Sequence, residues 1–162
     1  MSKPIEAEQK YANQSVLITG GGSGIGLAIA KRFASMGAKT LIVGRSESRL
    51  AEAVSEIQSI NPSGQHLFLA GDVSNETVIK DAVAKANGVA PLTVAVANAG
   101  TGGLSPVIAT EADHFDDIMR TNLRGTFLVF KHAGRAIVKT GGGAMCGICL
   151  LYTSPSPRDL RK

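Results

Sequence analysis

The chain has 162 residues, a length that suits one domain. Hydrophobic residues make up 44% and charged residues 19% of the sequence, which argues against disorder, and a net charge of +4 without a basic stripe excludes a nucleic-acid-binding surface. No apolar run reaches the ~18 residues that span a membrane, the first residues lack a signal-peptide core, and two cysteines suit a reducing compartment, so we expect a cytoplasmic protein.

Five short runs of strand-forming residues are spread along the chain between turn residues. They are SVLIT (15–19), TLIVG (40–44), HLFLA (66–70), LTVAVA (92–97) and GAMCGI (143–148). Each run is continuously apolar instead of alternating, a pattern typical of strands buried on both faces of a parallel sheet.

Helical periodicity fills the segments between these runs. Apolar residues share one helical face in four groups: Ile25, Ile29 and Phe33; Leu50, Val54 and Ile57; Val78, Ala82 and Ala86; and Leu123, Phe127, Phe130, Ala133 and Ile137. The expected N-caps are Ser46, Ser74 and Thr110. The alternation of strand and helix predicts one α/β domain with right-handed crossovers.

A glycine-rich loop, TGGGSGIG (19–26), follows the first expected strand and precedes the first helix. Gly20 permits a tight turn, Ser23 or Gly24 lets the backbone approach a ligand, and Gly26 lets the helix pack near the strand. The helix N-terminus then offers free N–H groups and a partial positive charge to a pyrophosphate. The loop therefore predicts dinucleotide binding, and the alternative is a tight turn without a ligand.

The spacing of this loop resembles the TGxxxGIG motif of the short-chain dehydrogenase/reductase family. Three further stretches match family motifs in order: GDVS (71–74), ANAG (97–100) and TNLRGTF (121–127). The resemblance covers residues ~13–148 and implies a doubly wound parallel Rossmann sheet of strand order 3-2-1-4-5. We therefore assign residues 1–148 to a cofactor-binding domain.

The resemblance also implies a set of site residues. Asp72 would lie beside the adenine ring, although it could instead contact the N-terminus of the next helix. Asn98 would hold the central sheet at the cofactor, and Asn122 would kink its helix and hold a water of the catalytic proton relay. The full set of expected cofactor-binding positions is Gly20, Gly22, Ser23, Gly24, Ile25, Gly26, Arg45, Ser46, Asp72, Val73, Asn98, Ala99 and Gly100.

The end of the second expected strand indicates which nicotinamide cofactor is bound. NAD-dependent enzymes usually carry an acid there, which accepts a hydrogen bond from the ribose 2′-OH. This chain has Gly44, followed by Arg45 and Ser46. An arginine pairs with a 2′-phosphate, whereas an acid repels it, so we expect NADP, with NAD as the alternative. Arg45 could also be a solvated loop residue.

The last residues lack the catalytic groups that the resemblance implies. The family's serine would fall near Leu150, and its tyrosine and lysine would fall beyond Lys162. Tyr152 is followed four residues later by Ser156, between two prolines, where no helix can align a tyrosine with a lysine. Asn122 is then the only member of the catalytic set, and we expect the 162-residue chain to be inactive.

Residues 149–159, CLLYTSPSPRD, resemble the translation of a transposase-type adapter used in sequencing libraries. We therefore expect the native sequence to end near Ile148 and residues 149–162 to form a non-native tail. The pair Cys146 and Cys149 is accordingly not expected to be a redox or zinc motif. His66, His114 and His132 have no ligand spacing, so no metal site is expected.

The expected function of the parent protein is NADP-dependent hydride transfer between a small-molecule carbonyl and an alcohol. The helix after Asn122 resembles the family's dimer helix, which implies a homodimer or homotetramer. A non-catalytic nucleotide-binding module with a genuine tail is the alternative. A different Rossmann enzyme, such as a methyltransferase, fits the ANAG and NLRG motifs less well.

Overall fold

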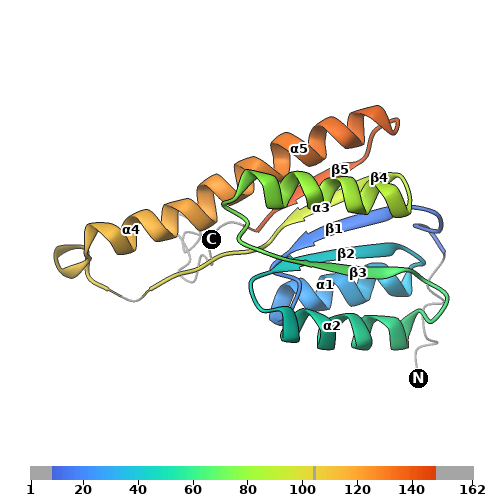
Figure 1. Cartoon of the computed structure of the whole chain (residues 1–162), viewed down its shortest axis with the longest axis horizontal. Helices are drawn as coiled ribbons and strands as arrows, with labels where there is room; N and C mark the ends of the chain where they lie inside the picture. Colours follow the sequence, from blue (N-terminus) through green and yellow to red (C-terminus); the bar gives the residue numbers. More distant parts are fainter. Residues whose placement is uncertain (1–8, 104, 149–162) are drawn as a thin grey trace, which may run out of the picture.

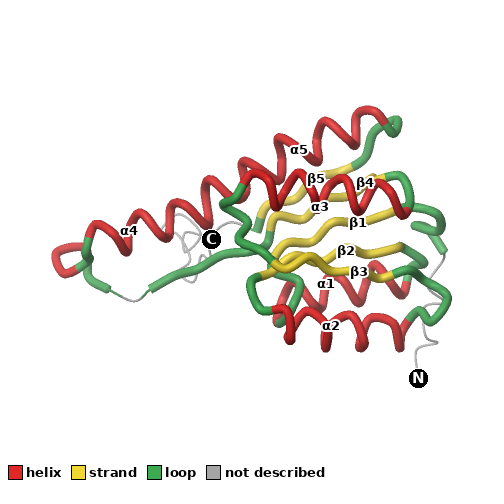
Figure 2. The backbone as a smooth tube through the Cα atoms, in the orientation of Figure 1, coloured by secondary structure: helices red, strands yellow, loops and turns green. Residues whose placement is uncertain are grey.

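The computed structural model describes residues 9–103 and 105–148. The strands in these residues form one parallel five-stranded sheet (Figures 1 and 2). The strand order is β3-β2-β1-β4-β5, as the resemblance implies. The strands are β1 (Ser15–Thr19), β2 (Lys39–Gly44), β3 (His66–Ala70), β4 (Leu92–Ala97) and β5 (Ala144–Gly147). The sequence therefore predicted every strand to within two residues at each end.

Helices cover both faces of the sheet in the described part of the chain. α1 (Gly24–Ser35) and α2 (Glu47–Ile60) lie on one face, and α3 (Glu76–Val89) and α5 (Gly125–Lys139) lie on the other (Figure 1). A 3-10 turn, η1 (Val107–Ala109), leads to α4 (Ala112–Met119), and a π-helical segment, η2 (Arg120–Arg124), joins α4 to α5. This arrangement is the doubly wound sheet expected from the sequence.

Two hydrophobic cores hold the helices on the sheet, because side chains alternate across each strand. In β1, Val16 and Ile18 pack with the side chains of α1 and α2, whereas Leu17 packs with those of α3 and α5. All three are fully buried. Burial of each side chain contributes about 1.5–3 kcal/mol, so the central strands are the most strongly held part of the domain.

Burial on both faces, expected for every strand, is found for β1, β2 and β4 but not for the edge strands β3, which is mostly half-buried, and β5. All four residues of β5 are exposed, and Met145 is 45% exposed. The reason is its place at the edge of the sheet, where β4 is its one partner among the described strands. Edge strands of this kind present unpaired backbone groups and promote association.

The helical face that packs on the sheet was predicted wrongly for α1. The expected stripe began at Ile25, but that side chain is 59% exposed. The buried residues of α1 are Gly26, Ala30 and Ala34, one position further round the helix. The buried face of α1 consists of small side chains, which let the helix approach the sheet closely.

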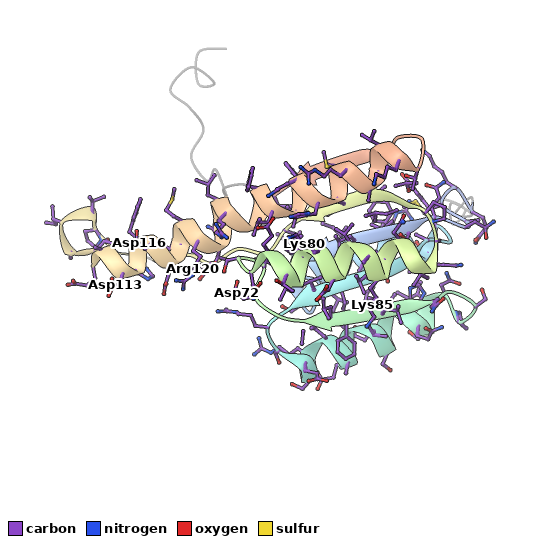
Figure 3. All side chains as sticks on the ribbon, turned by 45° about the horizontal axis from the view of Figure 1, so that its top comes forward. Asp72, Lys80, Lys85, Asp113, Asp116 and Arg120 are labelled. Atoms are coloured by element: carbon purple, nitrogen blue, oxygen red, sulfur yellow. The ribbon has the colours of Figure 1, made fainter. Side chains whose placement is uncertain are left out.

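The stripe predicted across the last helix was also partly wrong. Leu123 and Phe127 are 60% and 58% exposed. Ala133 and Ile137 are buried as expected, together with Leu128, Val129 and Gly125. The apolar side chains of this segment therefore divide between a face that packs on the sheet and an outer face that is exposed. α4 and η2 extend beyond the sheet, as Figure 1 shows at the left. Asp113, Asp116 and Arg120 project from this extension (Figure 3).

One of the three predicted N-caps is confirmed. The Ser46 hydroxyl accepts a hydrogen bond from Arg49 N at 3.5 Å and caps α2. The prediction for Ser74 is wrong, because the side chain of Asn75 caps α3 by accepting a hydrogen bond from Thr77 N. The prediction for Thr110 is wrong as well, because its hydroxyl donates to Pro106 O and closes the 3-10 turn. The residue before α4 is Glu111, whose side chain makes no capping hydrogen bond.

Candidate functional site

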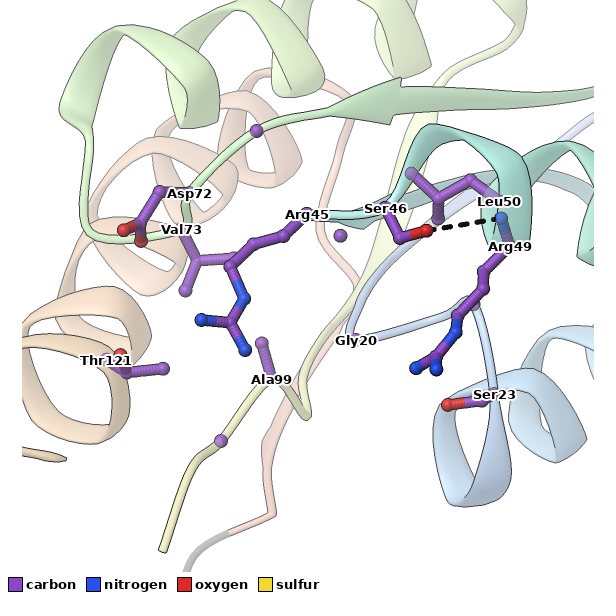
Figure 4. A pocket seen from close by; sticks show the side chains of 14 residues that line it. Gly20, Ser23, Arg45, Ser46, Arg49, Leu50, Asp72, Val73, Ala99 and Thr121 are labelled. Carbon is purple, nitrogen blue, oxygen red and sulfur yellow. Dashed lines mark hydrogen bonds between the residues drawn. The ribbon is translucent and has the colours of Figure 1, made fainter.

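A pocket of about 240 Å³ lies at the carboxyl edge of the sheet. It is formed by the segments that follow β1, β2, β3 and β4 and by Thr121 of η2 (Figure 4). The strand order reverses between β1 and β4. Crevices at such a switch point are where open α/β sheets bind ligands.

The glycine loop forms one wall of this pocket with the backbone geometry that the sequence predicts. Gly20 has φ +67°, a conformation that favours glycine. A Cβ on Gly26 would lie 2.2 Å from Gly20 O, so helix and loop meet at a distance that excludes any side chain. Ser23 precedes α1 without a side-chain cap, and the first amides of a helix have no intrahelical partner. The loop therefore presents backbone donors that suit an anion.

Asn98 ties β4 to β1 behind the pocket. Its Nδ2 donates to Thr19 O at 3.0 Å and to Gly20 O at 3.3 Å, and its backbone N donates to Thr19 Oγ1 at 3.1 Å. Asn98 is not one of the lining residues, whereas Ala99 and Gly100 are. Its side chain thus fixes the loop from behind, which fits the role of holding the sheet.

Asp72 lines the opposite wall, and its hydrogen bond fits the interpretation that it contacts the N-terminal end of the next helix, whereas its place beside an adenine ring stays a prediction. Its Oδ1 accepts from Ser74 N at 2.8 Å, just before α3. This hydrogen bond, aided by the positive charges of Arg120 and Arg45, lowers the pKa of the Asp72 carboxyl below its ordinary value. An ionised carboxylate therefore stands in the pocket beside Val73.

Asn122 lies in the π-helical segment, next to the lining residue Thr121, and is not itself one of the lining residues. Its Oδ1 accepts from Thr101 N, and its Nδ2 donates to Thr101 O, both at 2.8 Å. The Thr126 hydroxyl donates to Asn122 O at 2.7 Å. The side-chain amide of Asn122 therefore pins the loop after β4 to the helix, and π-helical turns of this kind often occur at functional sites.

Arg45 and Ser46 line the pocket at the end of β2, together with residues that sequence reasoning missed. Arg49 and Leu50 of the first turn of α2, and Thr121 of η2, also line it, as do Gly44 and Gly71 (Figure 4). One signal could have revealed Arg49. It follows Arg45 by four residues, where a helix start returns the chain to the same side.

The structure brings most predicted cofactor-binding residues together. Nine line the pocket: Gly20, Gly22, Ser23, Arg45, Ser46, Asp72, Val73, Ala99 and Gly100. Gly24, Ile25, Gly26 and Asn98 do not, because the first three run into α1 and the fourth points back at β1.

Other candidate residues serve structure in the described part of the chain. His66 is buried, with Nδ1 2.9 Å from the Thr40 hydroxyl and Nε2 3.3 Å from Asn61 O, and burial lowers its pKa. Residues 9–103 and 105–148 contain no group of three or more His, Cys, Asp or Glu side chains that could hold a metal ion. Cys146 is a free, exposed thiol. The expectations for Cys149, Leu150, Tyr152 and the 149–162 tail fall outside the described residues.

No helix of the described residues combines the length and apolar character needed to cross a bilayer. The strand order and the flanking helices are those of a Rossmann domain, with a candidate ligand pocket at its switch point.

Comparison with known proteins gives the family. The profile described as short chain dehydrogenase matches residues 14–152. A short-chain dehydrogenase/reductase of Armillaria gallica is 39% identical over 137 residues, which are 82% of this chain and 52% of that protein. A glucose 1-dehydrogenase of Gluconobacter oxydans is 32% identical over 139 residues, 85% of this chain and 52% of that protein. The chain belongs to the short-chain dehydrogenase family.

Solved structures agree with this assignment. A short-chain type dehydrogenase/reductase from Mycobacterium ulcerans matches with a TM-score of 0.81 at 32% identity, over 85% of this chain and 51% of that one. The chain thus spans about half the length of the relatives it matches.

Proposed function

We propose that this chain is the NADP-binding part of an oxidoreductase that interconverts a small-molecule carbonyl and an alcohol. The observation that carries the proposal is the pocket at the switch point, with the glycine loop on one side and Arg45 on the other. When bound, the nicotinamide cofactor would supply or accept the hydride. The residues of this chain would bind and orient it.

The choice of NADP over NAD rests on the charges around the end of β2. Gly44 ends the strand where NAD-dependent enzymes usually carry an acid, and Arg45 follows it into the pocket. Among the described residues that line the pocket, Asp72 is the one carboxylate, and it follows β3, not β2. A 2′-phosphate near Gly44 would therefore meet a guanidinium and no acid.

The proposed reaction class draws support from relatives. One relative is named glucose 1-dehydrogenase, and another, 31% identical over 131 residues, is named galactitol 2-dehydrogenase. Both names describe oxidation of a hydroxyl-bearing carbon. We accordingly propose a secondary alcohol or hemiacetal, or the corresponding carbonyl, as the substrate class of the parent protein.

We also propose that the 162-residue chain binds the dinucleotide without turning it over. Neither of its tyrosines is followed four residues later by a lysine. Tyr11 packs edge-to-face on Phe33, with ring centroids 5.0 Å apart, on the α1 side of the sheet. General acid–base catalysis is commonly worth about 10²–10⁴-fold, and neither tyrosine of the sequence has the Tyr-x-x-x-Lys spacing that would supply it.

Calorimetric titration with NADP⁺ and NAD⁺ tests the proposal. We expect the chain to bind NADP⁺ more tightly, and an alcohol or ketone panel to show no turnover. Failure to bind either dinucleotide, or tighter binding of NAD⁺, would contradict it. Extending the reading frame discriminates the alternative, because a serine followed by a Tyr-x-x-x-Lys motif downstream of Ile148 supports the oxidoreductase, whereas a genuine stop codon after Lys162 supports a non-catalytic module.

Self-association through the outer face of the long helix is part of the proposal. Phe115, Met119, Leu123 and Phe127 follow one another at intervals of four residues and are between 37% and 60% exposed. A continuous apolar stripe of this kind suits a second copy of the chain. Sedimentation velocity should show dimers that Phe127→Glu dissociates, while the control Ile60→Glu, on the opposite side of the sheet, leaves them intact.

A further inference from the structure

Two arginines reach into the pocket from the start of α2. Arg45 leaves the end of β2, and Arg49 lies on the first helical turn (Figure 4). In the close view, the guanidinium of Arg49 lies towards Ser23 of the glycine loop, and that of Arg45 lies towards Ala99. Within residues 9–103 and 105–148, neither guanidinium takes part in an ion pair or hydrogen bond. Both positive charges are therefore available to a ligand.

The backbone of Arg49 is fixed beside the glycine loop. The Ser46 hydroxyl accepts from Arg49 N, and the neighbouring Leu50 is 1% exposed. A Cβ on Gly22 would lie 3.4 Å from Leu50 Cδ2 and 3.8 Å from Arg49 Cβ. The first turn of α2 thus packs on the loop, and the long Arg49 side chain starts from an anchored position.

The charge of the proposed ligand calls for more than one cation. A phosphate monoester carries about −1.5 to −2 charges near pH 7, of which one guanidinium balances only part. The carboxylate of Asp72, which follows β3 and lines the same pocket, also interacts electrostatically with Arg45 and offsets some of its positive charge. A single arginine would therefore leave a 2′-phosphate incompletely neutralised.

We infer that Arg49 is a second specificity-determining residue, which binds the ribose 2′-phosphate of NADP together with Arg45. The inference rests on the proposed dinucleotide-binding function and goes beyond it by naming a residue from α2. Its competitor is an Arg49 that binds the diphosphate common to NAD and NADP, because Ser23 lies at the N-terminus of α1 where a diphosphate would bind. The two hypotheses differ in their prediction for a variant without the Arg49 side chain. A contact with the 2′-phosphate predicts weaker binding of NADP⁺ alone, whereas a contact with the diphosphate predicts weaker binding of both dinucleotides.

The test compares Arg49→Gln, Arg45→Gln and a control, Arg135→Gln, in the full 162-residue chain. Arg135 is an exposed arginine of α5, outside the pocket. We expect Arg49→Gln to weaken NADP⁺ binding roughly tenfold, which is ~1.4 kcal/mol, and to change NAD⁺ binding less than twofold. Arg49→Lys, which keeps the charge but loses the planar fork, should fall in between. The double variant Arg45→Gln/Arg49→Gln should bind the two dinucleotides with equal affinity.

The smaller ligands 2′-AMP and 5′-AMP isolate the phosphate in question. Arg49→Gln should weaken 2′-AMP and leave 5′-AMP unchanged. An equal loss for NADP⁺ and NAD⁺, or no loss for either, would overturn the role of Arg49 while leaving the proposed function intact. If the unaltered chain binds neither dinucleotide, the proposed function fails, and the inference fails with it. Retained NAD⁺ binding by the variants shows that they are folded.

Discussion

Replacement of Gly26 by alanine tests the tightest contact in the candidate site. The added Cβ would lie 2.2 Å from Gly20 O, 2.6 Å from Asn98 Nδ2 and 2.8 Å from Gly20 C. Two of these three atoms belong to backbone that is held by the positive φ of Gly20. The methyl group therefore cannot be accommodated by a side-chain rotation, and the loop or α1 must move.

The size of the effect follows from three contributions. Overpacking costs about 1–3 kcal/mol, and disturbing the hydrogen bonds of Asn98 to β1 costs about 1–3 kcal/mol more. Alanine returns up to about 1 kcal/mol through its better helix propensity, less at the first turn of α1. We expect Gly26→Ala to lower the free energy of unfolding by about 1–6 kcal/mol and to abolish the proposed dinucleotide binding, because the displaced loop loses the amides that we expect to face the phosphates.

Urea unfolding, followed by circular dichroism at fixed pH, measures this change, and Gly88→Ala is the matched control. Gly88 lies in α3, and a Cβ there would meet no atom within 4 Å. We expect the control to raise the free energy of unfolding by about 0.5–1 kcal/mol, since only the backbone entropy of the unfolded chain changes. A Gly26→Ala chain as stable as the unaltered one would refute the close packing of loop and helix.

Three further predictions concern single side chains in the described residues. Asn98→Ala should lower the free energy of unfolding by about 1–3 kcal/mol in urea, because two backbone carbonyls at the end of β1 lose their donor. Hydrogen bonds from Lys131 and His132 of α5 lower the pKa of Glu76 from 4.5 to about 2, so its contribution is present above pH 4.5 and lost as the pH falls to 2. The urea midpoints of Glu76→Gln and the unaltered chain should therefore differ at pH 6 and coincide near pH 2, and a constant difference would contradict this. Burial lowers the pKa of His66, so the unfolded chain binds the extra proton and stability falls as the pH drops below about 6.5, a dependence that His66→Asn should flatten between pH 7.5 and 5.

The strands could be predicted from the sequence because each is a short, continuous apolar run between turn residues. β1, β3 and β4 begin and end where the pattern indicates. Runs of this kind have one stable solution in a small α/β domain, which is burial between two helical layers. The parallel order came from the resemblance to a family, since apolar pattern alone does not say which strands are neighbours.

The helical faces and caps were harder to predict, because periodicity does not say how closely a helix approaches its sheet. In α1 the largest apolar residue of the first turn, Ile25, is exposed, while Gly26 and Ala30 are buried. A hydroxyl before a helix likewise predicts a cap only if the helix starts directly after it. Asn75 caps α3 in place of Ser74, whose backbone N donates a hydrogen bond to the Asp72 carboxylate in the preceding turn.

The candidate site shows the same division between local and long-range information. The glycine loop and Arg45 were predicted because each directly follows a strand and parallel strands end at one edge, whereas Asp72 was predicted from the resemblance to a family. Arg49 and Thr121 were missed because they lie inside helical segments, which reach the pocket only through the packing of α2 on the loop and through the π-helical turn. The four-residue spacing from Arg45 indicates that Arg49 returns to the same side of the chain, but it does not show that α2 packs on the loop.

The location of the pocket predicts that the residues that select the dinucleotide lie in a different part of the sequence from those that catalyse hydride transfer. Every described lining residue lies between Gly20 and Thr121, so the pocket is assembled from the segments after β1 to β4 and from η2. Discrimination between NADP⁺ and NAD⁺ should therefore depend on Arg45 and Arg49 alone in the 162-residue chain and in a longer parent protein. Turnover should appear only in a chain with a Tyr-x-x-x-Lys pair. Joining residues 1–148 to such a segment should therefore restore alcohol oxidation while the ratio of the two dissociation constants stays unchanged, and a ratio that changed would show that the later residues also reach the 2′-phosphate.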